Sequence, residues 1–189
     1  MKQVQTERKP GPHPWWGLVV VAIVVWHGFY TARTLGADYL FSLCYLTNLV
    51  LAAGLFCRSP LLIGIGFAWT LIGFPLWLGD VVITRAFVPS SLLFHTGGLF
   101  LGLYAARFMV LPRWLVLTGL PIGLFSCLLA RLFSDPQYNI NAVFRIQQGW
   151  EWLFPNFLTS YLTQVGAYAL ILLAFPRVCN KFIYKGSQP

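Results

Sequence analysis

The chain has 189 residues, of which 58% are hydrophobic and 10% charged, with a net charge of +8 and a mean hydropathy of +0.69. Soluble domains carry about 25% charged residues, so this composition excludes an ordinary soluble globular protein. It predicts an integral membrane protein built as one domain.

Six apolar stretches come close to the roughly 20 residues that a helix needs to cross a bilayer. In chain order they cover residues 15–34, 39–57, 60–79, 91–110, 113–132 and 157–176. The expected fold class is therefore all-α: a polytopic bundle of six transmembrane helices in 15–176, with tails at 1–14 and 177–189. The joints "RSP" and "LPR" are short enough to predict tight antiparallel hairpins between spans two and three and between spans four and five.

The first span follows Lys2, Arg8 and Lys9 and so resembles a secretory signal peptide. However, its apolar run is too long for one and lacks a small-residue cleavage site. Trp15 and Trp16 are typical of interfacial anchors. We therefore expect this segment to be retained as a membrane span.

The basic residues divide unequally between the two faces of such a bundle. One face, with both termini, would hold Lys2, Arg8, Lys9, Arg58, Arg107, Arg113, Arg177, Lys181 and Lys185, and the other only Arg33, Arg85, Arg131 and Arg145. Because cytoplasmic loops are enriched in Lys and Arg, this pattern predicts a multi-pass protein with both termini cytoplasmic. The topology explains the positive charge, so no nucleic acid partner is expected.

A long polar and aromatic segment separates the last two spans. The stretch "NAVFRIQQGWEWLF" is too polar to cross a membrane and too aromatic for free solvent. It is typical of a segment that lies in the interface, and we interpret residues 142–154, which include Trp150 and Trp152, as a lid. The alternative is a membrane-anchoring loop that does not contact the site.

A hydroxyl and an imidazole are expected at similar depth on two spans that run in the same direction. Thr47 lies nine residues after Asp38, about 13 Å along a helix, and His95 six residues after Pro89, about 9 Å. A hydroxyl becomes a useful nucleophile when a base such as imidazole takes its proton. This predicts a catalytic pair, Thr47 and His95, acting on a lipid ester from the outer leaflet. Alternatively, Thr47 bonds a carbonyl of its own helix and His95 bridges helices.

Other polar or aromatic residues on the same side of the bundle are predicted to form the substrate pocket: His27, Asn48, Asp80, Arg131, Gln164, Trp150 and Trp152. Interfacial salt bridging and helix packing are the alternative roles for them. No Cys-x-x-Cys or histidine cluster is present, so neither a metal nor a cofactor is predicted.

Short motifs resemble the androgen-induced family of multi-span membrane threonine hydrolases: "YLTNLVL" in span two, "FHTGG" in span four and "GWEWLFPNF" after span five. The resemblance implies hydrolysis of lipid esters, including fatty-acid esters of hydroxy fatty acids, with Thr47 as nucleophile and His95 as base. The connection between these residues is shorter here than in that family.

Two functional classes remain open from the sequence. The first is a membrane hydrolase or acyl-transfer enzyme whose substrate is a membrane lipid. The second is a small carrier or channel, or an accessory subunit, whose polar pocket lines a solute path or pairs with a membrane-protein partner or a second copy of the chain.

Overall fold

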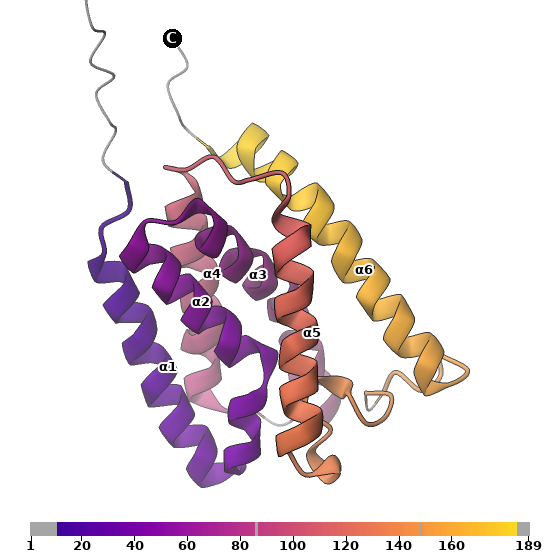
Figure 1. The fold of residues 1–189 in the computed structure, drawn as a ribbon. Coiled ribbons are helices and arrows are strands. Elements are labelled where there is room, and N and C mark those ends of the chain that lie inside the picture. The colour runs from indigo at the N-terminus through magenta and orange to yellow at the C-terminus, as the bar shows by residue number, and fades with distance from the viewer. Residues whose placement is uncertain (1–10, 86, 148, 185–189) are drawn as a thin grey trace, which may run out of the picture.

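The computed structural model describes residues 11–85, 87–147 and 149–184, and these form six α-helices and no strand. The helices are α1 (Trp15–Thr34), α2 (Leu43–Cys57), α3 (Pro60–Thr84), α4 (Pro89–Ala106), α5 (Leu115–Phe133) and α6 (Phe157–Val178). Four single turns join them or extend them: η1 (Ala37–Phe41), η2 (Pro136–Tyr138), η3 (Ile140–Ala142) and η4 (Cys179–Ile183). The helices run along one bundle, and both ends of the described chain lie at its upper end in Figure 1.

Local sequence signals set the helix ends. α3 begins with Pro60 at its first position, and the Ser59 side chain accepts a hydrogen bond from the Leu62 N–H. The Asn156 side chain caps α6 in the same way, by accepting from the Thr159 N–H. α2 ends at Cys57, and its C-cap residue Arg58 adopts the left-handed conformation at φ 51°. The expectation for residues 15–34 agrees with the observed first helix.

α3 is the central helix, with one hydrophobic cluster on each side. One cluster joins it to α5 and α6, and the other to α1, α2 and α4. Glycines let these helices approach closely, as is usual in membrane bundles. A Cβ at Gly102 of α4 would lie 2.6 Å from the Phe67 ring of α3, and a Cβ at Gly66 of α3 would lie 2.6 Å from Leu51 of α2.

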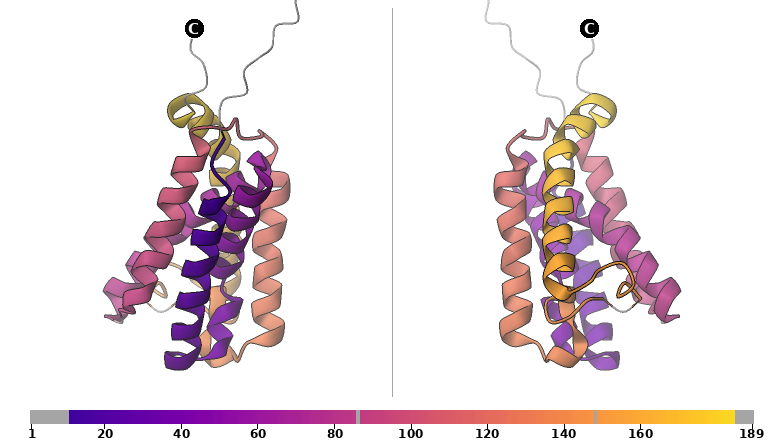
Figure 2. Two further views of the ribbon diagram at one scale, coloured as in Figure 1. Left: turned by 90° about the vertical axis from the view of Figure 1, so that its left-hand side faces the viewer. Right: turned by 90° about the vertical axis from the view of Figure 1, so that its right-hand side faces the viewer.

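α1 and α6 lie on opposite sides of the bundle, as the two turned views in Figure 2 show. α6 packs on its neighbours mainly through Leu172, Phe175 and Pro176, near its C-terminal end. Toward its N-terminal end it diverges from α5 (Figure 1).

Four of the helices are long and apolar enough to cross a membrane: α1, α3, α5 and α6 with its extension η4. α2 is apolar but has only 15 residues, because the chain before it forms the turn η1 and not the first part of the predicted span. α4 contains Ser90, Ser91 and His95, which lower its hydropathy. The structure thus gives an all-helical membrane-type protein with four candidate spans, and six spans remain a prediction.

One predicted hairpin is wrong. α2 and α3 pack tightly, as the short joint indicated. α5, by contrast, packs mainly on α6, with further contacts to α3 and α2, and forms no hairpin with α4. Residues 107–114 carry the chain across the end of the bundle, where the Leu111 N–H and C=O both bond the side chain of Asn180. A short connection therefore did not imply adjacent helices here.

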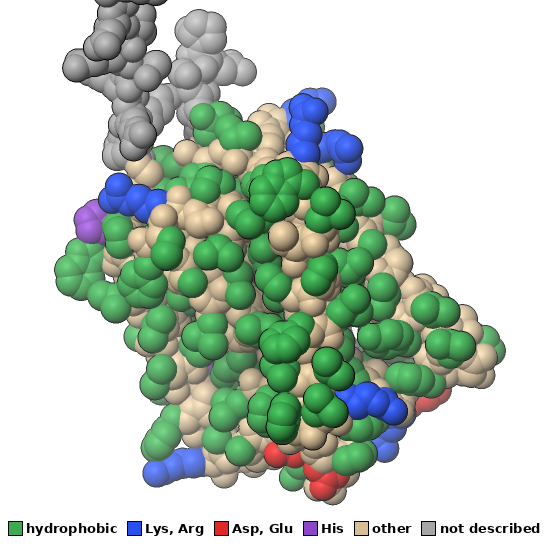
Figure 3. Space-filling model, in the orientation of Figure 1, with side chains coloured by type: hydrophobic (Ala, Val, Ile, Leu, Met, Phe, Trp, Pro, Cys, Tyr) green, Lys and Arg blue, Asp and Glu red, His purple; other side chains and the backbone are tan. Residues whose placement is uncertain are grey.

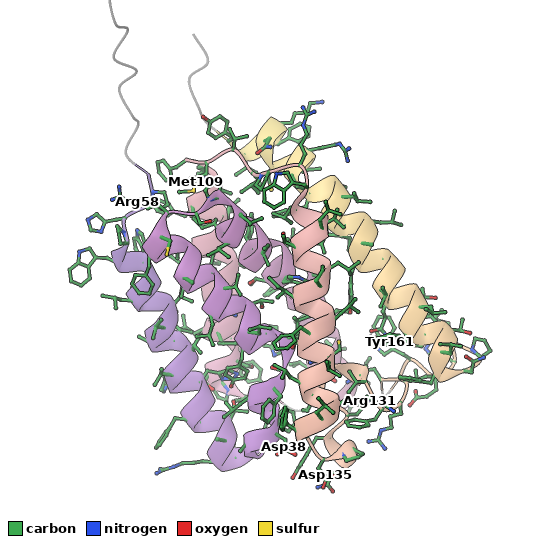
Figure 4. The ribbon with its side chains drawn as sticks, viewed as in Figure 1. Asp38, Arg58, Met109, Arg131, Asp135 and Tyr161 are labelled. Atoms are coloured by element: carbon green, nitrogen blue, oxygen red, sulfur yellow. The ribbon has the colours of Figure 1, made fainter. Side chains whose placement is uncertain are left out.

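Charged side chains gather toward the two ends of the bundle, and hydrophobic side chains cover its flank in Figure 3. Asp and Glu appear only at the lower end of the face shown there. At this end the Asp38 carboxylate accepts a hydrogen bond of 2.7 Å from the Asp135 N–H, which ties η1 to the segment after α5 (Figure 4). Four of the basic residues predicted on the cytoplasmic face lie outside the described residues: Lys2, Arg8, Lys9 and Lys185.

Candidate functional site

A buried hydroxyl–imidazole pair joins α1 to α4. Ser90 Oγ lies 2.8 Å from His27 Nδ1, and the two side chains are 1% and 6% exposed. Pro89 starts α4, which places Ser90 in the first turn of this helix. His27 lies in the second half of α1, near the same end of the bundle. A serine hydroxyl hydrogen-bonded to an imidazole is the arrangement in which a base can activate a nucleophile.

The surrounding hydrogen bonds assign the proton in this pair. Thr31 lies one turn after His27, and its Oγ1 is 3.4 Å and 3.5 Å from the two ring nitrogens, near the limit for a hydrogen bond. If Ser90 donates to Nδ1, its hydroxyl proton is satisfied and Nε2–H can point to Thr31. The opposite assignment leaves the Ser90 proton without an acceptor among the described residues. We therefore assign Ser90 as the donor and His27 Nδ1 as the acceptor.

His95 is held in one orientation by α3 and by its own helix. Its Nδ1 lies 3.2 Å from the Ser91 carbonyl oxygen, and its ring stacks on Trp77 with the centroids 4.8 Å apart. A carbonyl only accepts, so Nδ1 carries the proton and Nε2 keeps a lone pair. Trp77 Nε1 donates to Ser91 Oγ at 3.1 Å, and this hydroxyl donates to the Val88 carbonyl.

Phe94 connects the two histidines. Its ring lies 4.5 Å from the His27 ring and 5.1 Å from the His95 ring, measured between centroids. Tyr45 of α2 closes the other side of His27: the two rings are nearly parallel, 5.5 Å apart, and Tyr45 also packs on Phe94 at 4.8 Å. We call the residues of this group the histidine cluster: His27, Thr31, Tyr45, Trp77, Ser90, Ser91, Phe94 and His95.

Thr47 and Asn48 lie beside this cluster but use their polar groups within α2. The Thr47 hydroxyl donates to the Cys44 carbonyl at 3.2 Å, and Asn48 Nδ2 donates to the same oxygen at 2.9 Å. In the described part of the chain, no hydrogen bond joins Thr47 to His95. Asn48 does reach α4, because its Oδ1 occupies the space that a Cβ at Gly98, one turn after His95, would need.

The other predicted pocket residues lie outside the histidine cluster. Asp80 accepts a 3.2 Å hydrogen bond from Gln147, so the end of α3 is tied to the segment before α6. Arg131 donates to the Val143 carbonyl, and its guanidinium lies 5.4 Å from the Phe144 ring centroid. Gln164 donates to Ser160 of its own helix and lines a separate small cavity between α5 and α6.

The predicted lid is an irregular segment anchored by two asparagines. Asn141 Oδ1 accepts from the Leu43 N–H at 2.8 Å, and Asn139 Oδ1 accepts from the N–H groups of Phe144 and Arg145. Both asparagines have positive φ, Asn139 at 48° and Asn141 at 55°. Trp152 is 83% exposed, whereas Trp150 is half-buried. Residue 148, which belongs to the predicted lid, lies outside the described residues.

The sequence did not indicate Ser90, Thr31, Tyr45 or Trp77 as site residues. Ser90 is 63 positions from its partner His27, and it lies just outside the span expected at 91–110. The one available signal was depth, since His27 and His95 both lie near the same end of their helices. Depth does not give the rotation of a helix about its axis, which decides the partners.

Comparison with known proteins adds no identification: no protein-family model, no curated protein and no solved structure matches this chain. The class of protein that the fold defines is a helical membrane protein with a polar cluster buried among its helices.

Proposed function

We propose that this chain is a multi-pass membrane enzyme that hydrolyses a lipid ester or transfers its acyl group, using a buried hydroxyl activated by an imidazole. The observation that supports this most is the 2.8 Å hydrogen bond between Ser90 and His27. Polar residues within membrane helices carry a free-energy cost and commonly mark functional sites. Here two such polar residues, a potential nucleophile and a potential base, are hydrogen-bonded to each other.

In the proposed reaction, Ser90 is acylated and then deacylated, and His27 carries the proton in both steps. Ser90 Oγ attacks the ester carbonyl carbon while its proton moves to His27 Nδ1. The bond to the alkoxy group then breaks, and His27 returns the proton to the departing alcohol. A water molecule, or a second lipid hydroxyl in the transfer reaction, attacks the acyl-serine and gives its proton to His27. Release of the acid or of the new ester returns the proton to Ser90.

The position of Ser90 suits this reaction. It is the second residue of α4, so it lies about one helical rise of 1.5 Å from the start of the helix. The ester groups of membrane lipids lie at the boundary between hydrocarbon and headgroups, and water reaches this depth. Because the pair is buried, an ester enters only if the first turn of α4 separates from α1.

The Thr47–His95 pair remains the second candidate for the same reaction. His95 has a lone pair on Nε2, and Thr47 is fully buried on the neighbouring helix. For Thr47 to act, its hydroxyl must leave the Cys44 carbonyl and turn toward His95. Ser90 needs no such rearrangement to contact its base, and we therefore favour Ser90.

For the membrane arrangement, we propose six crossings with both termini cytoplasmic. α2 would cross together with the turn η1, and α4 would cross with its polar first turn near the outer face. The support is that both ends of the described chain lie at one end of the bundle (Figure 1). The excess of basic residues on that side agrees with this orientation.

A carrier of ions receives less support. The buried polar side chains are neutral or histidine, and no Asp, Glu, Lys or Arg is buried in the described residues. Intramembrane paths for ions and protons usually include such residues. The accessory-subunit alternative predicts full biological activity from variants that lack the Ser90 hydroxyl.

The test is hydrolysis of a long-chain lipid ester by the purified protein in lipid nanodiscs. Ser90→Ala should reduce the rate to background, and His27→Gln should reduce it by about 10²–10⁴-fold. The double variant should lose little more than Ser90→Ala, because the two side chains act as a unit. Thr96→Val is the matched control: Thr96 is a half-buried residue of the same helix, and its hydroxyl donates to the Leu92 carbonyl.

Three results contradict parts of this proposal. If the wild type shows no hydrolysis of carboxylic esters, the enzymatic function is wrong. If Ser90→Ala keeps the wild-type rate while Thr47→Ala abolishes it, the nucleophile is Thr47. If Thr96→Val loses as much as Ser90→Ala, the losses reflect damage to α4 and not removal of a nucleophile.

A further inference from the structure

The Tyr45 hydroxyl is buried without completing a hydrogen bond. The Tyr45 side chain is 6% exposed, and its hydroxyl oxygen makes no hydrogen bond within the described residues. Thr31 is close enough to interact with it but does not reach hydrogen-bonding geometry. It is the sole buried side-chain polar atom of the described residues in this condition. Leaving a buried hydroxyl without a hydrogen bond costs about 1–3 kcal/mol, and such groups are rare in folded proteins.

The ring that carries this hydroxyl is fixed by its neighbours. It lies parallel to the His27 ring, with an interplanar angle of 4°, and it packs on Phe94 at 4.8 Å. On its third side it lies against Gly28 of α1, where a Cβ would be in contact with the Tyr45 ring at 3.4 Å. The phenol is thus a donor held in place beside the imidazole that bonds Ser90, before any ligand arrives.

We infer that the Tyr45 hydroxyl donates a hydrogen bond to the carbonyl oxygen of the ester that Ser90 attacks. This inference rests on the proposed function and adds the group that binds the carbonyl. As the carbon becomes tetrahedral, its oxygen gains negative charge, and a fixed donor in a water-poor site stabilises that charge most. Tyr45 keeps its proton throughout, so the proton transfers between Ser90, His27 and the leaving alcohol are unchanged.

The same donor set limits the substrate class. The cluster offers hydroxyls and imidazoles, and no Lys or Arg of the described residues is buried beside them. A phosphodiester would bring a negative charge into this low-dielectric site without a cation to compensate it. A neutral carboxylic ester brings one carbonyl oxygen, which the single unpaired donor matches. The substrate is therefore an uncharged acyl ester group of a membrane lipid.

The test compares Tyr45→Phe with Tyr104→Phe in the wild-type background. Tyr104 is a half-buried tyrosine of α4 whose ring packs on Trp16 and Phe108, so it controls for loss of a phenolic hydroxyl. Tyr45→Phe should lower kcat by about 10²–10³-fold with little change in KM, as removal of an oxyanion donor does. Tyr104→Phe should keep the wild-type rate.

A second measurement separates this role from a structural one. Because the Tyr45 hydroxyl makes no hydrogen bond within the described residues, Tyr45→Phe should leave the ligand-free Tm unchanged or higher. A long-chain trifluoromethyl ketone, which forms a tetrahedral adduct with an activated serine, should raise the Tm of the wild type clearly more than that of Tyr45→Phe.

The outcomes are distinct. Wild-type hydrolysis that depends on Ser90 but persists in Tyr45→Phe overturns the role of Tyr45 and leaves the proposed function standing. A lower ligand-free Tm with normal kcat overturns it as well, since it means that a buried water or Thr31 uses the hydroxyl structurally. Absence of hydrolysis in the wild type overturns the proposed function and this inference together. Loss of kcat with an unchanged ligand-free Tm supports the inference.

Discussion

Replacing Gly98 by Ala tests the packing that holds the site together. A Cβ at this position of α4 would overlap Asn48 Oδ1 and lie 3.2 Å from Thr70 Cγ2. Asn48 is not free to move, because its Nδ2 donates to the Cys44 carbonyl at 2.9 Å. Overpacking costs about 1–3 kcal/mol. Loss of the hydrogen bond that Asn48 makes within α2 costs about 1 kcal/mol more. Against this, Ala gains about 1 kcal/mol over Gly in helix propensity.

The net expectation for Gly98→Ala is a loss of about 1–3 kcal/mol, or about 2–12 °C in Tm for a chain of this size. The assay is thermal unfolding of the detergent-solubilised protein. Gly166→Ala is the matched control, because a Cβ at Gly166 of α6 meets nothing within 4 Å. Asn48→Ala should remove most of the penalty, since the clashing atom is then gone. A Gly98→Ala protein as stable as Gly166→Ala would refute the close packing of α2 on α4.

Three further predictions concern the lower end of the bundle and the orientation. Asn141→Ala should lower stability by about 1–3 kcal/mol in a denaturation assay, because the half-buried Leu43 N–H loses its acceptor and the Phe41 carbonyl and Ser126 lose a donor. An unchanged midpoint would contradict this. With Trp152 as the reporter, brominated lipid at headgroup depth should quench its fluorescence, whereas fully aqueous emission would exclude an interfacial position. A cysteine at Gln137 should react with an impermeant reagent in intact cells, and reaction only after permeabilisation would reverse the proposed topology.

The sequence predicted the helical framework well, because apolar runs and prolines report directly on membrane helices. The apolar pattern located all six helices, and Pro60 and Pro89 mark two of their starts. The apolar pattern missed the turn η1, because the residues of this turn are apolar enough to resemble the start of a helix. In the structure, Gly36 at φ 121° precedes η1 and separates it from α1. Local composition does not reveal such a break.

The candidate site was predictable only in part. Depth along the helices indicated that polar groups of several spans gather near one end, and His27 and His95 do lie on the same Phe94 ring. The partners could not be predicted, because they depend on how each helix is rotated and tilted. The Thr47 hydroxyl donates to the backbone of its own helix, whereas Ser90, just before the span expected at 91–110, bonds a histidine 63 positions away.

The central claim, that Ser90 is a nucleophile activated by His27, is tested most directly by covalent labelling. A long-chain fluorophosphonate should react with the wild-type protein in nanodiscs, displacing fluoride, and mass spectrometry should find the adduct on Ser90. His27→Gln should slow this labelling strongly, because the hydroxyl loses its base. An adduct on Thr47, or wild-type labelling no faster than that of Ser90→Ala, would contradict the account.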